Sequence, residues 1–152
     1  MKTKFLLVLL IVFLSTTVFA AEREKFGIGV ILGEPTGITA KYMINDNNAI
    51  DAGAGWETSG DNKLHIYGDY LFHLYDVIEV PKGLLPLYFG VGGRIVFHDN
   101  DDNELGIRFP VGIEYVFEKA PLGAFFELVP VLDLAPDTEL DFEAGTGIRF
   151  FF

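Results

Sequence analysis

The sequence of 152 residues contains no cysteine. Disulfide bridges, cysteine-based zinc sites and a lipid anchor attached to an N-terminal cysteine are therefore excluded. After residue 20 the sequence also lacks any run of about 18 consecutive apolar residues, which is the length expected of a membrane-spanning helix. The chain thus has no disulfide framework and does not look like a helical membrane protein.

Positive charge and serine are also scarce. The sequence has 11 Lys and Arg residues against 22 Asp and Glu residues, a formal net charge of −11. Such an acidic chain is not expected to bind nucleic acid or an anionic surface through its bulk charge. Ser59 is the one serine after residue 20, so candidates for a serine nucleophile are few.

The first twenty residues have the features of an export signal. Lys2 and Lys4 make the start positive, residues 5–14 form an unbroken apolar run, and residues 18–20 (Val-Phe-Ala) provide small residues at a cleavage site. The apolar run is too short to cross a bilayer as a helix. We predict a signal peptide over residues 1–20 and one mature domain over residues 21–152.

In the mature chain, apolar and polar residues alternate in segments that are separated by turns rich in Gly, Pro, Asn and Asp. We predict eight strands, over residues 26–32, 37–44, 49–57, 63–75, 87–98, 105–118, 123–134 and 141–152. Most are near or above the length of about 9–11 residues that a tilted membrane strand needs. The predicted fold is an all-β, eight-stranded, antiparallel, up-and-down transmembrane barrel.

The two faces of these strands differ in bulk and charge. Phe109, Val111 and Ile113 alternate with Arg108 and Gly112, for example, and the apolar face carries no charge. So many large residues would overfill the interior of an eight-stranded barrel. A glycine-rich face with few charges suits a narrow polar interior, so we predict apolar side chains toward lipid. A soluble, periplasmic, ligand-binding barrel is the alternative.

Charged residues on the polar face are predicted to meet inside the barrel. Because an isolated buried charge is costly, the four cations and five anions should pair into a network that closes the interior. A gated pore or a proton path is the alternative interpretation. The predicted network comprises Lys41, Asp51, Asp69, Arg94, Arg108, Glu114, Glu127, Glu143 and Arg149.

Two prolines fit the strand pattern poorly. Pro110 and Pro130 fall in the middle of neighbouring strands, where each removes a ladder hydrogen bond in a sheet without edges. A bulge at either residue would accommodate the proline and shift the facing beyond it. The facing of Asp133, which follows Pro130, is therefore less well defined, and the predicted network does not include it.

The C-terminal segment, residues 145–152 (Gly-Thr-Gly-Ile-Arg-Phe-Phe-Phe), resembles the assembly signal of small outer-membrane barrels. Gly147, Phe150 and Phe152 carry this similarity, whereas Gly145 stands where a polar residue is usual. The whole mature chain resembles the OmpA/OmpX-like barrels, including short uncharacterised bacterial members of that superfamily. The resemblance implies a monomer in the outer membrane, contact with its lipids and lipopolysaccharide, and recognition by the barrel assembly machinery.

Some barrels of this superfamily modify lipid A, so a hydrolase or acyltransferase is an alternative function. Ser59 is predicted to lie at the same rim as His65 and His98, but no nucleophile-elbow motif surrounds it. We predict no catalytic residue and no cofactor. The favoured role is structural or in surface interactions.

An acidic segment follows the fifth predicted strand. Asp99, Asp101 and Asn103 resemble the start of an EF-hand loop, but Glu104 stands where the loop needs glycine. We predict a solvated loop and no metal site. Weak bridging of lipopolysaccharide phosphates through divalent cations stays open as an alternative.

Overall fold

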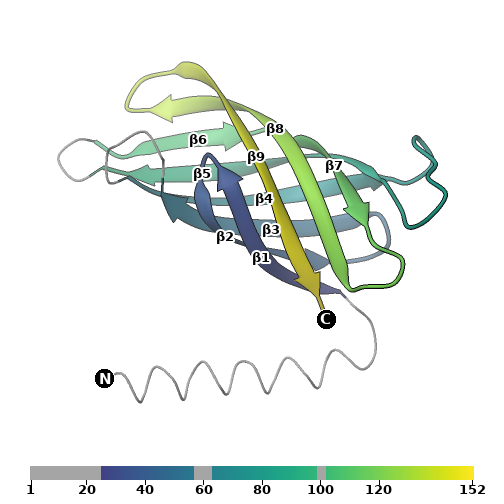
Figure 1. Cartoon of the computed structure of the whole chain (residues 1–152). Helices are drawn as coiled ribbons and strands as arrows, with labels where there is room; N and C mark the ends of the chain where they lie inside the picture. Colours follow the sequence, from purple (N-terminus) through teal and green to yellow (C-terminus); the bar gives the residue numbers. More distant parts are fainter. Residues whose placement is uncertain (1–24, 57–62, 99–101) are drawn as a thin grey trace, which may run out of the picture.

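The computed structural model describes residues 25–56, 63–98 and 102–152, and all of its regular secondary structure there is antiparallel β-sheet (Figure 1). The predicted signal peptide lies outside the described residues and stays a prediction. The strands are β1 (Phe26–Gly33), β2 (Thr36–Met43), β3 (Asn48–Trp56), β4 (Leu64–Leu74), β5 (Leu87–Phe97), β6 (Glu104–Arg108), β7 (Val111–Val116), β8 (Leu122–Ala135) and β9 (Glu139–Phe151).

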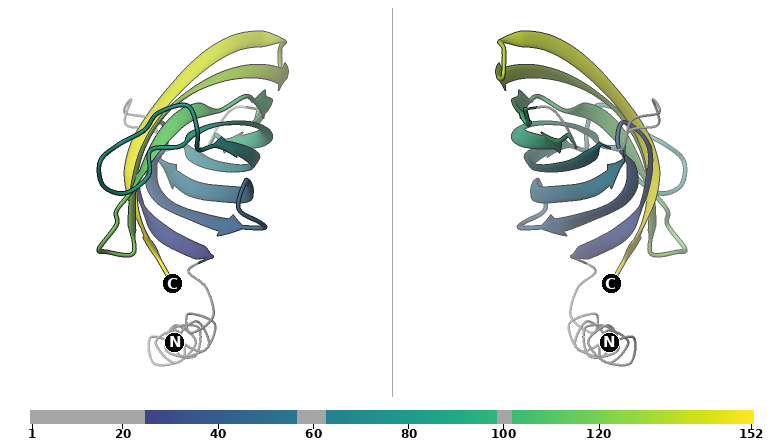
Figure 2. Two further views of the ribbon diagram at one scale, coloured as in Figure 1. Left: turned by 90° about the vertical axis from the view of Figure 1, so that its right-hand side faces the viewer. Right: turned by 90° about the vertical axis from the view of Figure 1, so that its left-hand side faces the viewer.

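The sheet closes on itself. β1 pairs with both β2 and β9, and β4 pairs with both β3 and β5. β6 and β7 both pair with β5 on one side and with β8 on the other, so together they occupy one position in the ring. Figure 2 shows the strands curving round this ring. The predicted eight-stranded antiparallel barrel is confirmed, with one of its strands interrupted.

The interruption lies at Phe109 and Pro110, where a single strand over 105–118 was predicted. No shift in facing accompanies it. Arg108 pairs with Gly92 before the break and Val111 pairs with Phe89 after it, which is the same register. Pro110 is therefore accommodated without a bulge between β5 and the interrupted strand.

Backbone hydrogen bonds explain how both prolines fit. A proline lacks the N–H donor but keeps a carbonyl acceptor. Gly90 N donates to Pro110 O at 2.9 Å, and Phe109 N donates to Pro130 O at 2.9 Å. A register shift does occur between β6 and β8, away from both prolines. Leu105 pairs with Ala135 and the next residue, Gly106, pairs with Asp133, so Leu134 is the extra residue on β8.

The connections gather at two ends of the barrel. Those between β2 and β3, β4 and β5, and β7 and β8 lie at the end where β1 begins and β9 ends, which we call the terminal end (Figure 1). The longest of these, residues 75–86, folds back on β7, where Leu84 and Val116 exchange backbone hydrogen bonds of 3.0 and 2.8 Å. Gly83 has a φ of 75°, a conformation that favours glycine.

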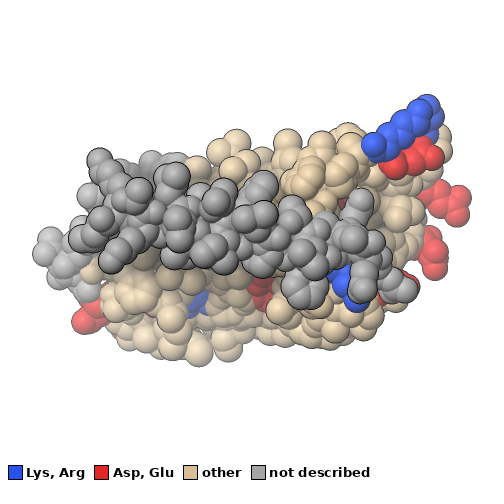
Figure 3. All heavy atoms as spheres, turned by 90° about the horizontal axis from the view of Figure 1, so that it is seen from below, with Lys and Arg blue, Asp and Glu red and all other residues tan. Residues whose placement is uncertain are grey.

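The barrel has its apolar side chains outside and its charges inside. In β4, outward residues such as Ile66 are exposed while His65, Tyr67 and Asp69 are buried. Large exposed apolar residues occur on every strand, for example Val30 at 55 % and Ile38 at 62 % exposure. On the face shown in Figure 3, the protruding charged side chains lie toward the two ends of the barrel. The part of the surface between them that is drawn in colour is mainly uncharged.

A small apolar cluster accompanies the charges in the interior, formed by Ile31, Ala49, Leu71, Tyr88 and Phe125. Among the described residues, no helix is long and apolar enough to cross a membrane.

Candidate functional site in the barrel interior

The structure places all nine residues of the predicted network in the interior, each with 5 % or less of its surface exposed. Strand geometry explains their common direction, because alternate side chains on a strand point to the same face of the sheet. They come from β2 to β9 and lie at different heights along the barrel axis. The contacts below divide them into three clusters.

The first cluster lies toward the terminal end. Lys41 Nζ is 3.1 Å from Glu114 Oε1, and Arg149 Nη1 is 3.5 Å from Glu114 Oε2. Arg149 also pairs with Asp51 at 3.4 Å. Lys41 donates a hydrogen bond of 2.7 Å to His73 Nε2, which leaves the other ring nitrogen to donate to Asn47 O at 3.1 Å.

The second cluster surrounds Arg108 at mid-height. Arg108 Nε donates to Asp69 Oδ1 at 3.0 Å. The same guanidinium lies 3.5 Å from Glu127 and 3.7 Å from Glu143. One cation thus faces three carboxylates, which come from β4, β8 and β9.

The third cluster surrounds Arg94 toward the opposite end. Arg94 lies 2.8 Å from Asp133 and 2.9 Å from Glu143. Longer contacts of 3.4 and 3.6 Å join it to Asp141 and Glu104 at the rim. Asp133 is 7 % exposed and belongs to the network although it was not predicted to do so. If the alternation of inward and outward residues is continued from Glu127 through Pro130, Asp133 falls on the inward face.

The clusters form one continuous system. Glu143 contacts both Arg94 and Arg108, and Asp51 lies directly opposite Asp69 in the register of β3 and β4. Among the described residues, the buried charges comprise four cations and six carboxylates once Asp133 is included. The fully ionised interior would therefore be acidic rather than nearly balanced, and its potential would disfavour anions.

Each of the buried cations Arg108, Arg149 and Lys41 also lies over an aromatic ring. The guanidinium carbon of Arg108 is 3.9 Å from the centre of the Tyr67 ring. That of Arg149 is 4.1 Å from the Phe125 ring, and Lys41 Nζ is 5.3 Å from the Tyr88 ring. Cation–π attraction is strongest where water is excluded, so these stacks help to stabilise cations in the interior.

A glycine lies opposite each of these three rings. Gly53 pairs with Tyr67, Gly112 with Tyr88, and Gly147 with Phe125 on the neighbouring strand. A Cβ atom at any of the three glycines would overlap the ring. The inward glycines thus let the rings lie flat against the sheet, which leaves room for the cations above them. The small size of the residues on this face was predicted from the sequence, but their matching with aromatic residues on neighbouring strands was not.

We predict that Gly53→Ala destabilises the protein by about 1–3 kcal/mol, the usual cost of overpacking. The added methyl group would push the Tyr67 ring toward Arg108. Gly68→Ala is the matched control, because Gly68 faces outward and its added Cβ would meet nothing closer than Asp51 O at 3.8 Å. Urea unfolding in detergent measures both variants, and equal stability would show that the flat ring is unimportant.

The other candidate residues are placed as follows. Ser59, Asp99 and Asp101 lie outside the described residues. His65, the second residue of β4, is fully buried and lies 3.5 Å from Glu143. Asn103 accepts a hydrogen bond of 3.3 Å from His98 N, and Glu104 pairs with His98 at 3.2 Å. Within the described part of the chain, no group of three His, Asp or Glu residues is placed to hold a metal ion.

The predicted assembly signal lies on β9 and on the residue that follows it, Phe152. Phe150 faces outward at 48 % exposure, and Gly147 lies beneath the Phe125 ring. The Phe152 ring packs edge-on against Phe26 at a centroid distance of 5.5 Å, which joins the two ends of the described barrel. These contacts describe the folded protein, and recognition by the assembly machinery stays a prediction.

Comparisons with known proteins give a match of structure. No family model and no curated protein matches the sequence. The structure is similar to the N-terminal β-barrel domain of Pseudomonas aeruginosa OprF, with a TM-score of 0.61 and 16 % sequence identity. The match covers 86 % of this chain and 98 % of that domain. The chain therefore has the fold of the OprF barrel domain.

Proposed function

We propose that the protein is an integral outer-membrane β-barrel with a structural or surface-interaction role, and that its charged network closes the interior. The inverted distribution of side chains carries this proposal. Every strand presents large apolar residues outward, and the buried set is dominated by charged and polar side chains. A soluble barrel would bury its apolar face, whereas an outer-membrane barrel turns that face to lipid.

The size of the apolar surface supports the membrane location. Soluble monomers rarely expose contiguous apolar patches beyond a few hundred Å². Here the exposed apolar residues include Ile38 at 62 %, Trp56 at 59 % and Phe142 at 66 %. The fold shared with the barrel domain of OprF, an OmpA-like outer-membrane barrel, supports the same location.

Cell fractionation tests the location. We expect the protein in the outer-membrane fraction, and its folded form should migrate differently on a gel from the boiled form. Closed barrels resist detergent because every strand is paired and no sheet edge is available for unfolding. Recovery in the soluble periplasmic fraction would contradict the proposal and favour the ligand-binding barrel.

The closed interior predicts little or no steady conductance of the wild-type protein in planar bilayers. An eight-stranded barrel has only enough internal space for side chains, and here the large charged side chains and the rings stacked on them occupy it. Steady single-channel currents in the wild type would contradict the closed interior. They would instead favour a cation-selective path, since the buried carboxylates outnumber the buried cations among the described residues.

A further inference from the structure

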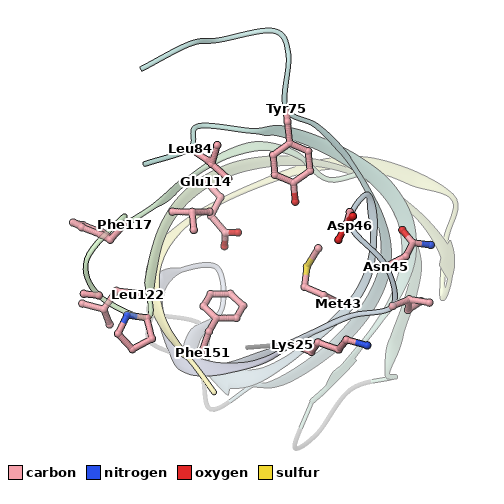
Figure 4. Close-up of a pocket in the computed structure, with 14 residues that line it drawn as sticks. Lys25, Met43, Asn45, Asp46, Tyr75, Leu84, Glu114, Phe117, Leu122 and Phe151 are labelled. Atoms are coloured by element: carbon pink, nitrogen blue, oxygen red, sulfur yellow. The ribbon is translucent and has the colours of Figure 1, made fainter. Parts of the chain in front are cut away.

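A cavity of about 670 Å³ lies at the terminal end of the barrel (Figure 4). All three connections of this end contribute to its lining: Asp46 comes from the first, Tyr75 and Leu84 from the second, and Pro121 from the third. Phe151, the last residue of β9, completes the wall. The volume is within the range of about 300–1,000 Å³ that is typical of small-molecule sites. We call this cavity the vestibule.

The vestibule ends at the charged network. Glu114 forms its inner limit, where the carboxylate contacts Lys41 at 3.1 Å and Arg149 at 3.5 Å. The apolar cluster that includes Leu71, Tyr88 and Phe125 fills part of the interior. The vestibule is therefore a recess that opens at one end of the barrel. A molecule could bind in it whether or not ions pass through the rest of the interior.

The lining is mostly apolar with a few polar groups. Met43, Val116 and Phe151 provide apolar contacts, and Figure 4 shows the Tyr75 and Phe151 rings directed into the space. Glu114 supplies hydrogen-bond acceptors at the inner end. Because Lys41 and Arg149 already offset its charge, a bound molecule needs no positive charge of its own. Lys25 and Asp46, of opposite charge, also line the cavity, and a carboxylate ligand has no hydrogen to donate to Glu114.

We propose that the vestibule binds a small, uncharged aromatic molecule that carries a hydroxyl group. Its ring would contact Tyr75 and Phe151, and its hydroxyl would donate a hydrogen bond toward Glu114. Aromatic contacts favour a planar ring in this lining. A buried carboxylate strengthens the hydrogen bond because the acceptor is charged.

Met43 provides a local reporter for this proposal. It lines the vestibule and is the one methionine after residue 20, so a ¹³C-methyl methionine label gives a single protein signal in the mature chain. We expect benzyl alcohol to shift this signal saturably in detergent-solubilised protein. Benzoate, which has a similar ring but a negative charge, should cause at most a small shift at the same concentration. Equal saturable binding of benzoate would overturn the proposed hydroxyl–carboxylate contact.

Two variants distinguish binding of benzyl alcohol in the vestibule from its general uptake into the detergent micelle. Val116→Trp should fill the vestibule and abolish the saturable shift, while Tyr75→Leu should weaken binding about threefold or more by removing an aromatic contact. Tyr75 lies outside the strands, so its replacement tests the site even if Val116→Trp fails to fold. A shift that grows linearly with benzyl alcohol and is the same in wild type and Tyr75→Leu would overturn the proposal.

Discussion

Replacing Arg108 with alanine is expected to lower the free energy of unfolding by about 3–5 kcal/mol, the usual cost of breaking a buried ion pair from one side. Arg108 is 1 % exposed and lies within 3.7 Å of Asp69, Glu127 and Glu143. Its removal would leave three carboxylates near one another without their shared cation. It would also remove the guanidinium that lies over the Tyr67 ring.

Equilibrium unfolding by urea in detergent micelles measures this effect. Asp102→Ala is the control for a charge change at an exposed site and should cost less than about 0.5 kcal/mol. Arg108→Lys should fall between the two, because lysine keeps the charge but loses the planar guanidinium. If Arg108→Ala costs no more than Asp102→Ala, the network does not stabilise the barrel. Leakage of ions through Arg108→Ala but not through wild type would further support a closing role.

A charge on the outer face should be similarly harmful in a bilayer. We expect Val91→Arg to destabilise the membrane-inserted barrel by about 2–4 kcal/mol, provided that this site lies near the bilayer midplane. Val91 is 47 % exposed and belongs to β5, where it pairs with Tyr70 of β4. Its side chain points away from the interior, so the arginine would face hydrocarbon rather than the charged network.

Val91→Ser is the matched control, because it removes the apolar side chain without adding charge. Refolding into lipid vesicles, followed by urea unfolding, compares the two variants. Gly92 is unsuitable as an inward comparison, since any Cβ there would overlap Asp69 Oδ1 and Gly68 O. Equal stability of Val91→Arg and Val91→Ser would mean that Val91 does not face lipid.

Local sequence patterns were sufficient to predict the barrel and the direction of its charges. Alternation along a strand is a property of neighbouring residues, so the inward placement of Lys41, Arg94 and Arg149 follows once each strand is recognised. Turn-forming residues marked the strand ends to within a few residues. The sequence alone does not show how Pro110 is accommodated, because its carbonyl accepts a hydrogen bond from Gly90 on a neighbouring strand.

The partners of each charge depended on the tertiary structure. Arg108 meets Asp69 from β4 and Glu143 from β9, although these residues are far apart in the sequence. The stagger between strands and the closure of the ring decide which charges lie at the same height along the barrel axis. The alternation of residues within one strand contains no information about the stagger or the closure. The pairing of Gly53 with Tyr67, and of Tyr67 with Arg108, arises in the same way. The direction of the charges is therefore local, whereas their pairing and the vestibule exist only in the closed barrel.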